Sequence, residues 1–172
     1  MGKLGTMPGL YEVGRNHGKR FIFMTSITMR FLADPSTVNF GGKVHGGTVM
    51  KWIDEAGYAC ATSWARRYCV TVSVGSIRFK RPIMIGDLVE VEASLAYTGT
   101  TSMNISVEVR AGDMKMGEMQ VITGCLVVFV AVDLDGKALP IEPWHPSTPG
   151  DMALAQNVKA HLDAARTMQP GN

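Results

Sequence analysis

Alternating apolar and polar residues predict a strand early in the chain. Over residues 21–32, Ile27, Met29 and Phe31 fall on one face of an extended backbone, which is the period-2 pattern of a half-buried strand. Residues 34–36 read Asp-Pro-Ser, a sequence that breaks a strand. A glycine-rich loop then runs to residue 42.

A helix is predicted over residues 47–64. Its buried stripe consists of apolar residues at helical spacing, namely Val49, Ile53, Ala56 and Cys60. The centre of this helix, residues 55–61, is rich in small side chains. Small side chains let other elements approach a helix closely, so we expect a sheet that curls around it.

Four further strands are predicted after the helix, at residues 70–79, 88–97, 100–110 and 116–132. The short turns between them predict an antiparallel meander. The expected fold class is therefore α+β, with an antiparallel five-stranded sheet wrapped around one central helix. An edge strand of such a sheet needs cover, which predicts a homodimer at minimum, with symmetric sites at the shared boundary.

The two ends of the chain differ from this central domain, which is expected to span residues 21–146. Residues 1–20 are rich in glycine and basic residues and lack the apolar stretch of a signal peptide, so a flexible N-terminal arm is expected. Residues 140–150 contain four prolines and end the regular part. The C-terminal tail, residues 147–172, contains a predicted helix at 153–168.

Composition narrows the class of protein. A chain of 172 residues with 46% hydrophobic residues fits one domain with a sizeable core. A formal net charge of +2 gives no argument for nucleic-acid binding, and no apolar run approaches the ~18 residues of a membrane span. The three cysteines lack metal-ligand spacing, and so sparse a count is typical of the reducing cytoplasm, where we expect the protein.

The residues with the clearest chemical meaning lie around the start of the central helix. Gly46 and Gly47 stand where helix N–H groups point outward without partners, so they can bind a developing negative charge. Asn39 supplies an amide nearby, and Asp54 in the second turn can act as a base or a nucleophile. Together they indicate acyl transfer or hydrolysis without a metal.

These residues and several later motifs resemble those of the hotdog-fold acyl-CoA thioesterases, in particular the short-chain bacterial group related to brain acyl-CoA hydrolase. The resemblance covers roughly residues 27–140 and includes the 15-residue separation of Asn39 and Asp54. Its other motifs lie at 45–47, 79–82, 86–87, 99–102, 129–133 and 136–140. The resemblance implies a hotdog fold, hydrolysis of acyl-CoA in fatty acid metabolism, no cofactor other than the CoA of substrate and product, and a hexamer built as a trimer of dimers.

The resemblance also implies roles at the helix start. Asp54 would activate water or attack the thioester, Asn39 of a neighbouring subunit would help to orient the water or the thioester, and the N–H groups of Gly46 and Gly47 would form an oxyanion hole. Each has a structural interpretation as well. Asn39 can stabilise its loop, Asp54 can favour a helix N-terminus, and His45 fits a structural turn residue better than a catalytic base.

A second group of residues is predicted to bind the CoA portion of the substrate. Arginine makes charge-assisted bonds to phosphate, and hydroxyls beside a glycine turn can add to them. The candidates for the nucleotide are Arg81, Thr100, Thr101 and Ser102, and those for the pantetheine tunnel are Val72, Ser73 and Val74. Three methionines are assigned to the core rather than to an acyl pocket: Met103, Met116 and Met119.

Other functions on the same fold compete with this interpretation. A hydratase needs a histidine beside its acid, and Asp54 has none on its helix. A non-catalytic acyl-CoA sensor would normally carry a DNA-binding segment, for which residues 1–20 are too short and too rich in glycine. A thioesterase of the phenylacetyl-CoA type also fits the His-Gly-Gly turn at 45–47, and it differs in acyl preference rather than in reaction.

Overall fold

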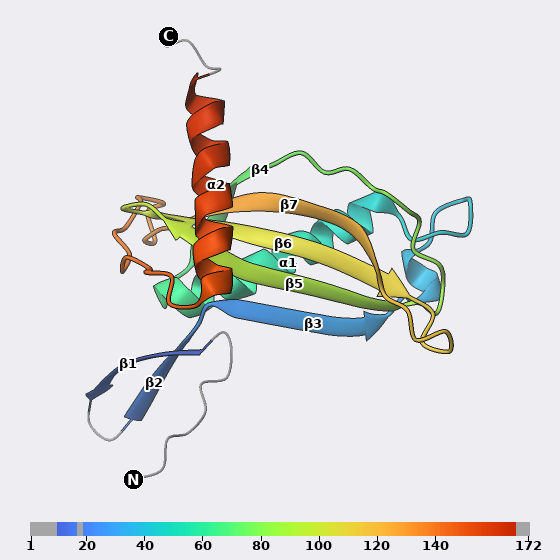
Figure 1. Cartoon of the computed structure of the whole chain (residues 1–172), viewed down its shortest axis with the longest axis horizontal. Helices are drawn as coiled ribbons and strands as arrows, with labels where there is room; N and C mark the ends of the chain where they lie inside the picture. Colours follow the sequence, from blue (N-terminus) through green and yellow to red (C-terminus); the bar gives the residue numbers. More distant parts are fainter. Residues whose placement is uncertain (1–9, 17–18, 168–172) are drawn as a thin grey trace.

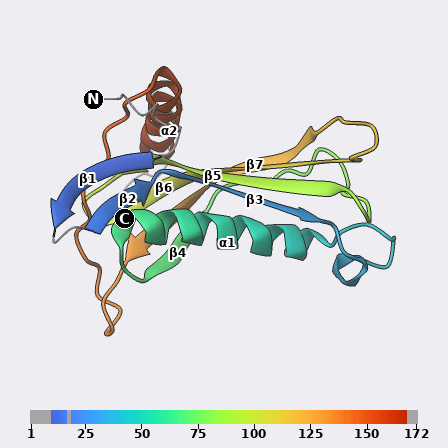
Figure 2. The ribbon, with the colours of Figure 1, turned by 90° about the horizontal axis from the view of Figure 1, so that it is seen from below.

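A five-stranded antiparallel sheet carries one helix on each of its faces (Figures 1 and 2). The structure is a computed structural model that describes residues 10–16 and 19–167. Its strands are β1 Leu10–Asn16, β2 Lys19–Met24, β3 Ser26–Leu32, β4 Cys69–Val74, β5 Leu88–Thr98, β6 Ser102–Gly112 and β7 Gln120–Ala131. Its helices are the 3-10 turn η1 Pro35–Thr37, α1 Gly46–Ala65 and α2 Pro149–Thr167. The strand order in the main sheet is β3-β5-β6-β7-β4.

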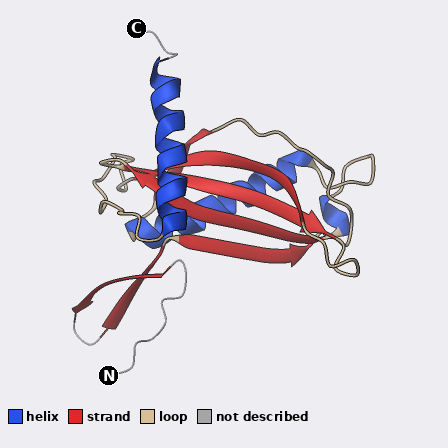
Figure 3. Cartoon of the chain, in the orientation of Figure 1, coloured by secondary structure: helices blue, strands red, loops and turns tan. Residues whose placement is uncertain are grey.

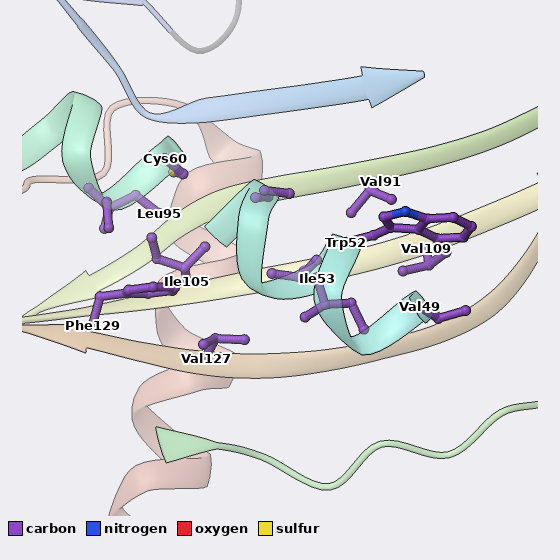
Figure 4. Packing of buried hydrophobic residues seen from close by; sticks show 14 of the residues in the cluster. Val49, Trp52, Ile53, Cys60, Val91, Leu95, Ile105, Val109, Val127 and Phe129 are labelled. Atoms are coloured by element: carbon purple, nitrogen blue, oxygen red, sulfur yellow. The ribbon is translucent and has the colours of Figure 1, made fainter. Parts of the chain in front are cut away.

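The predicted fold, one sheet wrapped around a central helix, is confirmed. The apolar stripe of α1 packs into the curve of the sheet, against alternate residues of the central strands β5, β6 and β7 (Figure 4). Alternation is regular over most of β5 and β6, and in β5 Val89, Val91 and Ala93 are fully buried while the residues between them, Glu90 and Glu92, are not. The core therefore lies between α1 and the sheet.

Close packing of α1 depends on Gly57, in the stretch of small residues at 55–61. A Cβ added at Gly57 would stand 2.7 Å from Cε2 of Phe129, whose ring is fully buried. Real Cβ atoms do not approach carbon so closely, so a larger residue would displace either the Phe129 ring or the helix. The composition of the helix centre thus corresponds to a contact with the sheet.

The order of the strands differs from the predicted meander. Only β5, β6 and β7 follow one another as neighbours, whereas β4 pairs with β7 at the far edge, with Cys69 opposite Ala131. Both edges of β5 are already occupied, by β3 and β6, so β4 pairs with the free edge of β7. Residues 75–87 join β4 to β5.

The predicted strand at 70–79 ends earlier, at Val74. Beyond it the chain still follows β7, since the N–H of Gly75 donates to the Leu126 carbonyl at 2.8 Å and that of Lys80 to the Ile122 carbonyl at 2.9 Å. These isolated bonds do not form a regular ladder. The last strand is also shorter than the predicted 116–132, because a turn with Gly117 at φ +69° precedes β7.

The N-terminal strand predicted at 21–32 is divided at Thr25 into β2 and β3. β2 pairs with β1 in a separate hairpin, so part of the predicted arm at 1–20 has regular structure (Figure 3). Trp64, near the end of α1, meets Phe23 of β2 edge to face, with ring centroids 5.4 Å apart, and links this hairpin to α1. Residues 1–9 of the predicted arm lie outside the described residues.

The tail helix is present but begins at Pro149, ahead of the predicted 153. Asp151 and Thr148 explain the earlier start, because the Asp151 carboxylate accepts from the Thr148 N–H at 3.1 Å. The Thr148 hydroxyl in turn accepts from the Asp151 N–H at 3.1 Å. This reciprocal pair is a capping arrangement. The predicted end at 168 lies outside the described residues.

Candidate active site

His45 and the two glycines after it form the start of α1. The imidazole Nδ1 of His45 accepts a hydrogen bond from the Gly47 N–H at 3.0 Å, which makes His45 the N-cap of the helix. The Gly46 N–H donates to no acceptor in the described part of the chain. Of the two N–H groups predicted to be free, only that of Gly46 is free within the described residues, because that of Gly47 is bonded to His45. His45 has the structural role that the sequence favoured for it.

Asn39 closes the loop that leads into α1. Its Oδ1 accepts hydrogen bonds from the N–H groups of Gly41 and Lys43, at 2.8 and 3.3 Å. The loop-stabilising interpretation of Asn39 therefore applies within one chain. Its side-chain NH₂ group donates to no acceptor among the described residues, so two donors stay available to a ligand.

A cavity of about 320 Å³ lies beside the start of α1. Asn39, Gly46 and Arg81 all line it, so the structure brings a predicted CoA-binding residue together with two residues predicted for the reaction. Lys43 and Lys80 also line this cavity, and no carboxylate does among the described residues. A lining of cations beside a free helix N–H favours an anionic ligand such as a phosphate.

A second cavity, of about 540 Å³, adjoins the first and shares Arg81 with it. Its lining contains three carboxylates beside Arg81, those of Asp87, Asp113 and Glu118, so it is negatively charged overall. Met116 also lines this second cavity and is 74% exposed, while Met119 is 37% exposed. The assignment of Met116 and Met119 to the core is therefore wrong. That of Met103, which is fully buried, is confirmed.

Asp54 lies on a face of α1 that the sheet leaves uncovered. Its neighbours one turn away, Met50 and Tyr58, are 50% and 37% exposed in the single chain. Its Oδ1 accepts a hydrogen bond from the Thr71 hydroxyl of β4 at 2.6 Å. Eight residues of helix place Asp54 about 12 Å along the axis from Gly46. The structure thus separates Asp54 from the cavity that holds Asn39.

Thr71 is a candidate site residue that the sequence argument missed. It belongs to β4, whose sequence Cys-Val-Thr-Val-Ser-Val reads as an ordinary edge strand. Thr71 is opposite the inward-facing Phe129, and its hydroxyl donates to Asp54 of α1 while the residue stays exposed in the single chain. Alternation would place the three valines of this strand inward and Thr71 outward, so the pattern of the strand gave no signal for it.

The residues predicted to bind CoA do not form one site within the chain. Arg81 shares a cavity with Gly112 at the end of β6, whereas Ser102 begins β6 at the opposite end of the sheet (Figure 1). An 11-residue strand separates these ends by about 33 Å. The carbonyls of Thr100 and Thr101 accept backbone bonds from Ile141 and Ala131, so this turn is tied to the segment after β7. Val72, Ser73 and Val74 lie exposed on β4, which is an edge strand of the sheet.

The cysteine thiols are unsuited to nucleophilic chemistry. Burial raises the pKa of the Cys60 thiol to about 12 and that of Cys125 to about 11, so both are protonated at neutral pH. The part of the chain that the structure describes also contains no cluster of three His, Cys, Asp or Glu side chains suited to a metal ion. Within the described residues, the groups in position to act are therefore carboxylate, hydroxyl, amide and cationic groups.

Comparisons with known proteins agree with this fold. Residues 41–118 match the family model described as the thioesterase superfamily. The acyl-CoA thioester hydrolase YciA of Escherichia coli is 36% identical over 121 residues, which cover 67% of this chain and 92% of YciA. The chain belongs to the thioesterase superfamily. The matched range contains Gly46, Asp54 and Thr71 of this thioesterase, but not Asn39.

Solved structures of thioesterases have the same hotdog architecture. A hexameric acyl-CoA thioesterase in its apo form is 30% identical, with a TM-score of 0.79 over 85% of this chain and 95% of that one. An acyl-CoA hydrolase from Staphylococcus aureus, solved with butyryl-CoA and CoA, is 25% identical with a TM-score of 0.76, over 83% and 87% of the two chains. None of the described helices in this thioesterase is long and apolar enough to cross a membrane.

Proposed function

We propose that this thioesterase hydrolyses acyl-CoA to a free carboxylic acid and CoA. The observation that carries the proposal is the cavity beside the start of α1, where a free N–H, an amide and cationic side chains meet. A thioester carbonyl needs a hydrogen-bond donor for its developing negative charge, and the CoA phosphates need cations. The name of YciA and the butyryl-CoA bound to the S. aureus hydrolase support this substrate class.

In the proposed reaction the thioester oxygen accepts a hydrogen bond from the Gly46 N–H. Asp54 acts by one of two routes. As a base it removes a proton from water, the hydroxide adds to the carbonyl carbon, and the carbon–sulfur bond breaks to release CoA thiolate, which takes up a proton. As a nucleophile its carboxylate displaces the thiolate and forms an anhydride, which water then hydrolyses. Thr71 orients the carboxylate through its hydroxyl on both routes.

A second copy of the chain completes the proposed site. Asp54 is too far along α1 to reach a thioester at Gly46 of its own chain, whereas it lies on an exposed helix face beside the edge strand β4. Val72 and Val74 on that strand are 55% and 45% exposed. Pairing of two β4 edges would cover these valines and bring Asp54 of one copy toward Asn39 of the other. The hexameric relative supports an assembly of three such dimers.

Three positions that were substituted in the S. aureus hydrolase support the grouping of Asn39, Asp54 and Thr71 in one site. Variants of that protein have been solved with alanine in place of an asparagine, an aspartate and a threonine. Those positions are separated by 15 and 17 residues, which are also the separations of Asn39, Asp54 and Thr71. Agreement in residue type and in both separations supports grouping Thr71 with the other two.

The proposal is tested by release of free thiol from a panel of short, long and aryl acyl-CoA substrates. Catalytic release from at least one substrate is expected, and the best substrate separates the short-chain from the phenylacetyl-CoA type. Binding of CoA without thiol release from any substrate would contradict hydrolysis and favour an acyl-CoA sensor. Sedimentation of the same sample measures whether the protein is dimeric or larger.

Replacing Arg81 with alanine is expected to raise KM for acyl-CoA about tenfold with a smaller change in kcat. Phosphate contacts are made equally in the ground state and the transition state, so their loss weakens binding more than it slows the chemical step. Arg78 provides the matched control, because it is an exposed cation three residues away that lines neither cavity. An unchanged KM in Arg81→Ala, or an equal rise in Arg78→Ala, would remove Arg81 from the site.

Replacing Thr71 with valine is expected to lower kcat by about tenfold to a hundredfold, the effect of losing one hydrogen bond to a charged group. The substitution keeps the shape of the side chain but removes the donor to Asp54. Thr71→Ser keeps a hydroxyl and is expected to restore most of the activity. If Thr71→Ser loses as much activity as Thr71→Val, retention of the hydroxyl does not preserve activity, and the proposed role of the hydrogen bond to Asp54 is contradicted.

A further inference from the structure

The outer face of the sheet, which points away from α1, is charged over β3, β5 and β6. Arg30 Nε lies 2.6 Å from Glu90, and Arg110 reaches both Glu90 and Glu92, at 3.2 and 3.4 Å. Arg110 also pairs with Glu108 on its own strand. Such a network is what the solvent-facing side of an antiparallel sheet normally carries.

The same face is apolar over β7 and β4. Leu126, Val128 and Val130 alternate with the buried Val127 and Phe129 and therefore point outward. Val70 of β4 lies opposite Val130 and extends this apolar region to the edge of the sheet. All four outward residues are half-buried in the single chain. An apolar outer face at the edge of a sheet indicates that something packs on it.

Helix α2 crosses this outer face from the charged region toward the apolar one (Figures 1 and 2). Leu154 lies with Glu92 of β5 and Ser106 of β6 around a small cavity. One turn later, Val158 lies with Leu126 of β7 around another. Val158 is buried. Along the helix, successive turns therefore cover successive strands in the order β5, β6 and β7.

The last turns of α2 extend past the sheet. A helix rises about 1.5 Å per residue and strands lie about 4.8 Å apart, so each strand is crossed in about three residues. At that spacing Leu162, four residues after Val158, is expected over β4, and residues 163–167 are expected beyond its edge. Figure 1 shows this end of α2 standing clear of β4. Leu154, Val158 and Leu162 follow one another at intervals of four, so the apolar stripe continues toward the projecting end.

We propose that the C-terminal turns of α2 dock on the outer face of a second copy of this chain, against the apolar region at its β4 and β7. The proposal rests on the dimer of the proposed function, in which two β4 edges pair. That pairing sets the apolar region of one copy directly in the path of the α2 of the other. Twofold symmetry makes the contact twice, so each helix would pack across the boundary where the two β4 strands pair. An isolated helix end would gain little stability in water without such a partner.

The test compares Leu162→Glu with Lys159→Glu in the full-length protein. Both place a carboxylate on the same part of α2, but Leu162 belongs to the apolar stripe whereas Lys159 is exposed. Leu162→Glu is expected to raise the dimer dissociation constant, measured by sedimentation, about tenfold or more, because a buried leucine contributes that much to association. Lys159→Glu is expected to change it less than threefold. Equal constants for the two variants and the wild type would overturn the proposal.

A truncated chain ending at Ala160 gives a second test of the contact that does not depend on whether Leu162→Glu folds. Its circular dichroism is expected to keep the sheet signal and its dimer is expected to weaken as in Leu162→Glu.

Hydrogen exchange of α2 in the wild type is expected to slow with rising protein concentration, and protection independent of concentration would contradict the proposed contact. If Leu162→Glu converts a hexamer to a dimer but leaves the dimer dissociation constant unchanged, the proposal is also overturned. In that case α2 would lie at the contact between dimers and not within one dimer. Wild-type thiol release tests the proposed function separately from these measurements.

Discussion

Replacing Asp54 with asparagine is expected to lower kcat for acyl-CoA hydrolysis by about 10²- to 10⁴-fold, the usual contribution of a positioned base or nucleophile. Asparagine has the same shape as aspartate and can still accept the hydrogen bond from Thr71, but it cannot take up a proton from water or attack a thioester. The side chain is exposed in the single chain, so folding is expected to be unaffected. Thiol release at saturating substrate measures kcat, and equilibrium binding of CoA is expected to be unchanged.

Glu55→Gln is the matched control for this experiment. Glu55 is the next residue of α1, is also exposed, and pairs with Lys51 at 3.5 Å rather than with a residue of β4. Its loss is expected to change kcat less than twofold. Near-normal turnover in a folded Asp54→Asn protein would exclude Asp54 from the reaction, and an equal loss in Glu55→Gln would point to a general effect of charge on α1.

Replacing Gly57 with valine is expected to lower the free energy of unfolding by about 2–3 kcal/mol. The first added carbon would already stand 2.7 Å from Cε2 of Phe129, so either the ring or the helix must move in a close-packed core. Chemical denaturation followed by circular dichroism measures the change. The gain in helix propensity on replacing glycine, about 0.5 kcal/mol, is too small to offset the strain.

Ala59→Val is the control for the Gly57 experiment. Ala59 lies on the same helix but is only half-buried, so the substitution is expected to cost no more than about 0.7 kcal/mol, the difference in helix propensity. Phe129→Leu combined with Gly57→Val is expected to recover part of the lost stability, because the smaller side chain makes room for the valine. Additive losses in the double variant would show that the two residues do not compete for the same space.

Asp54 and Asn39 illustrate why the active site is proposed at a boundary between two copies. In one chain Asn39 lies with Gly46 and Arg81 at the cationic cavity, while Asp54 faces away on another part of α1. The separation of about 12 Å along α1 keeps the Gly46 N–H and the Asp54 carboxylate from acting on one thioester within a single chain. A site that needs both groups therefore has to be completed by a second copy.

The parts of the fold that sequence could predict are those set by neighbouring residues. Apolar spacing located α1 within one residue at each end, and alternation located β5 within one residue of its observed end. The small residues around Gly57 predicted a closely packed helix, and the glycine turn after Asn39 pointed to the start of the site. Each of these features depends on the period of a helix or strand or on the conformational freedom of glycine, which are local properties.

Tertiary structure alone decided the features that depend on residues far apart in the sequence. β4 lies beside β7 because β5 has no free edge, and Thr71 meets Asp54 because β4 then passes along α1. Arg81 and Thr100 are at opposite ends of the sheet, although their types alone suit the same phosphate. Local patterns fix which faces of helices and strands are apolar. Pairing between strands depends on which strand edges are still free once the core has formed. Because all strands compete for those edges, the outcome depends on the whole chain.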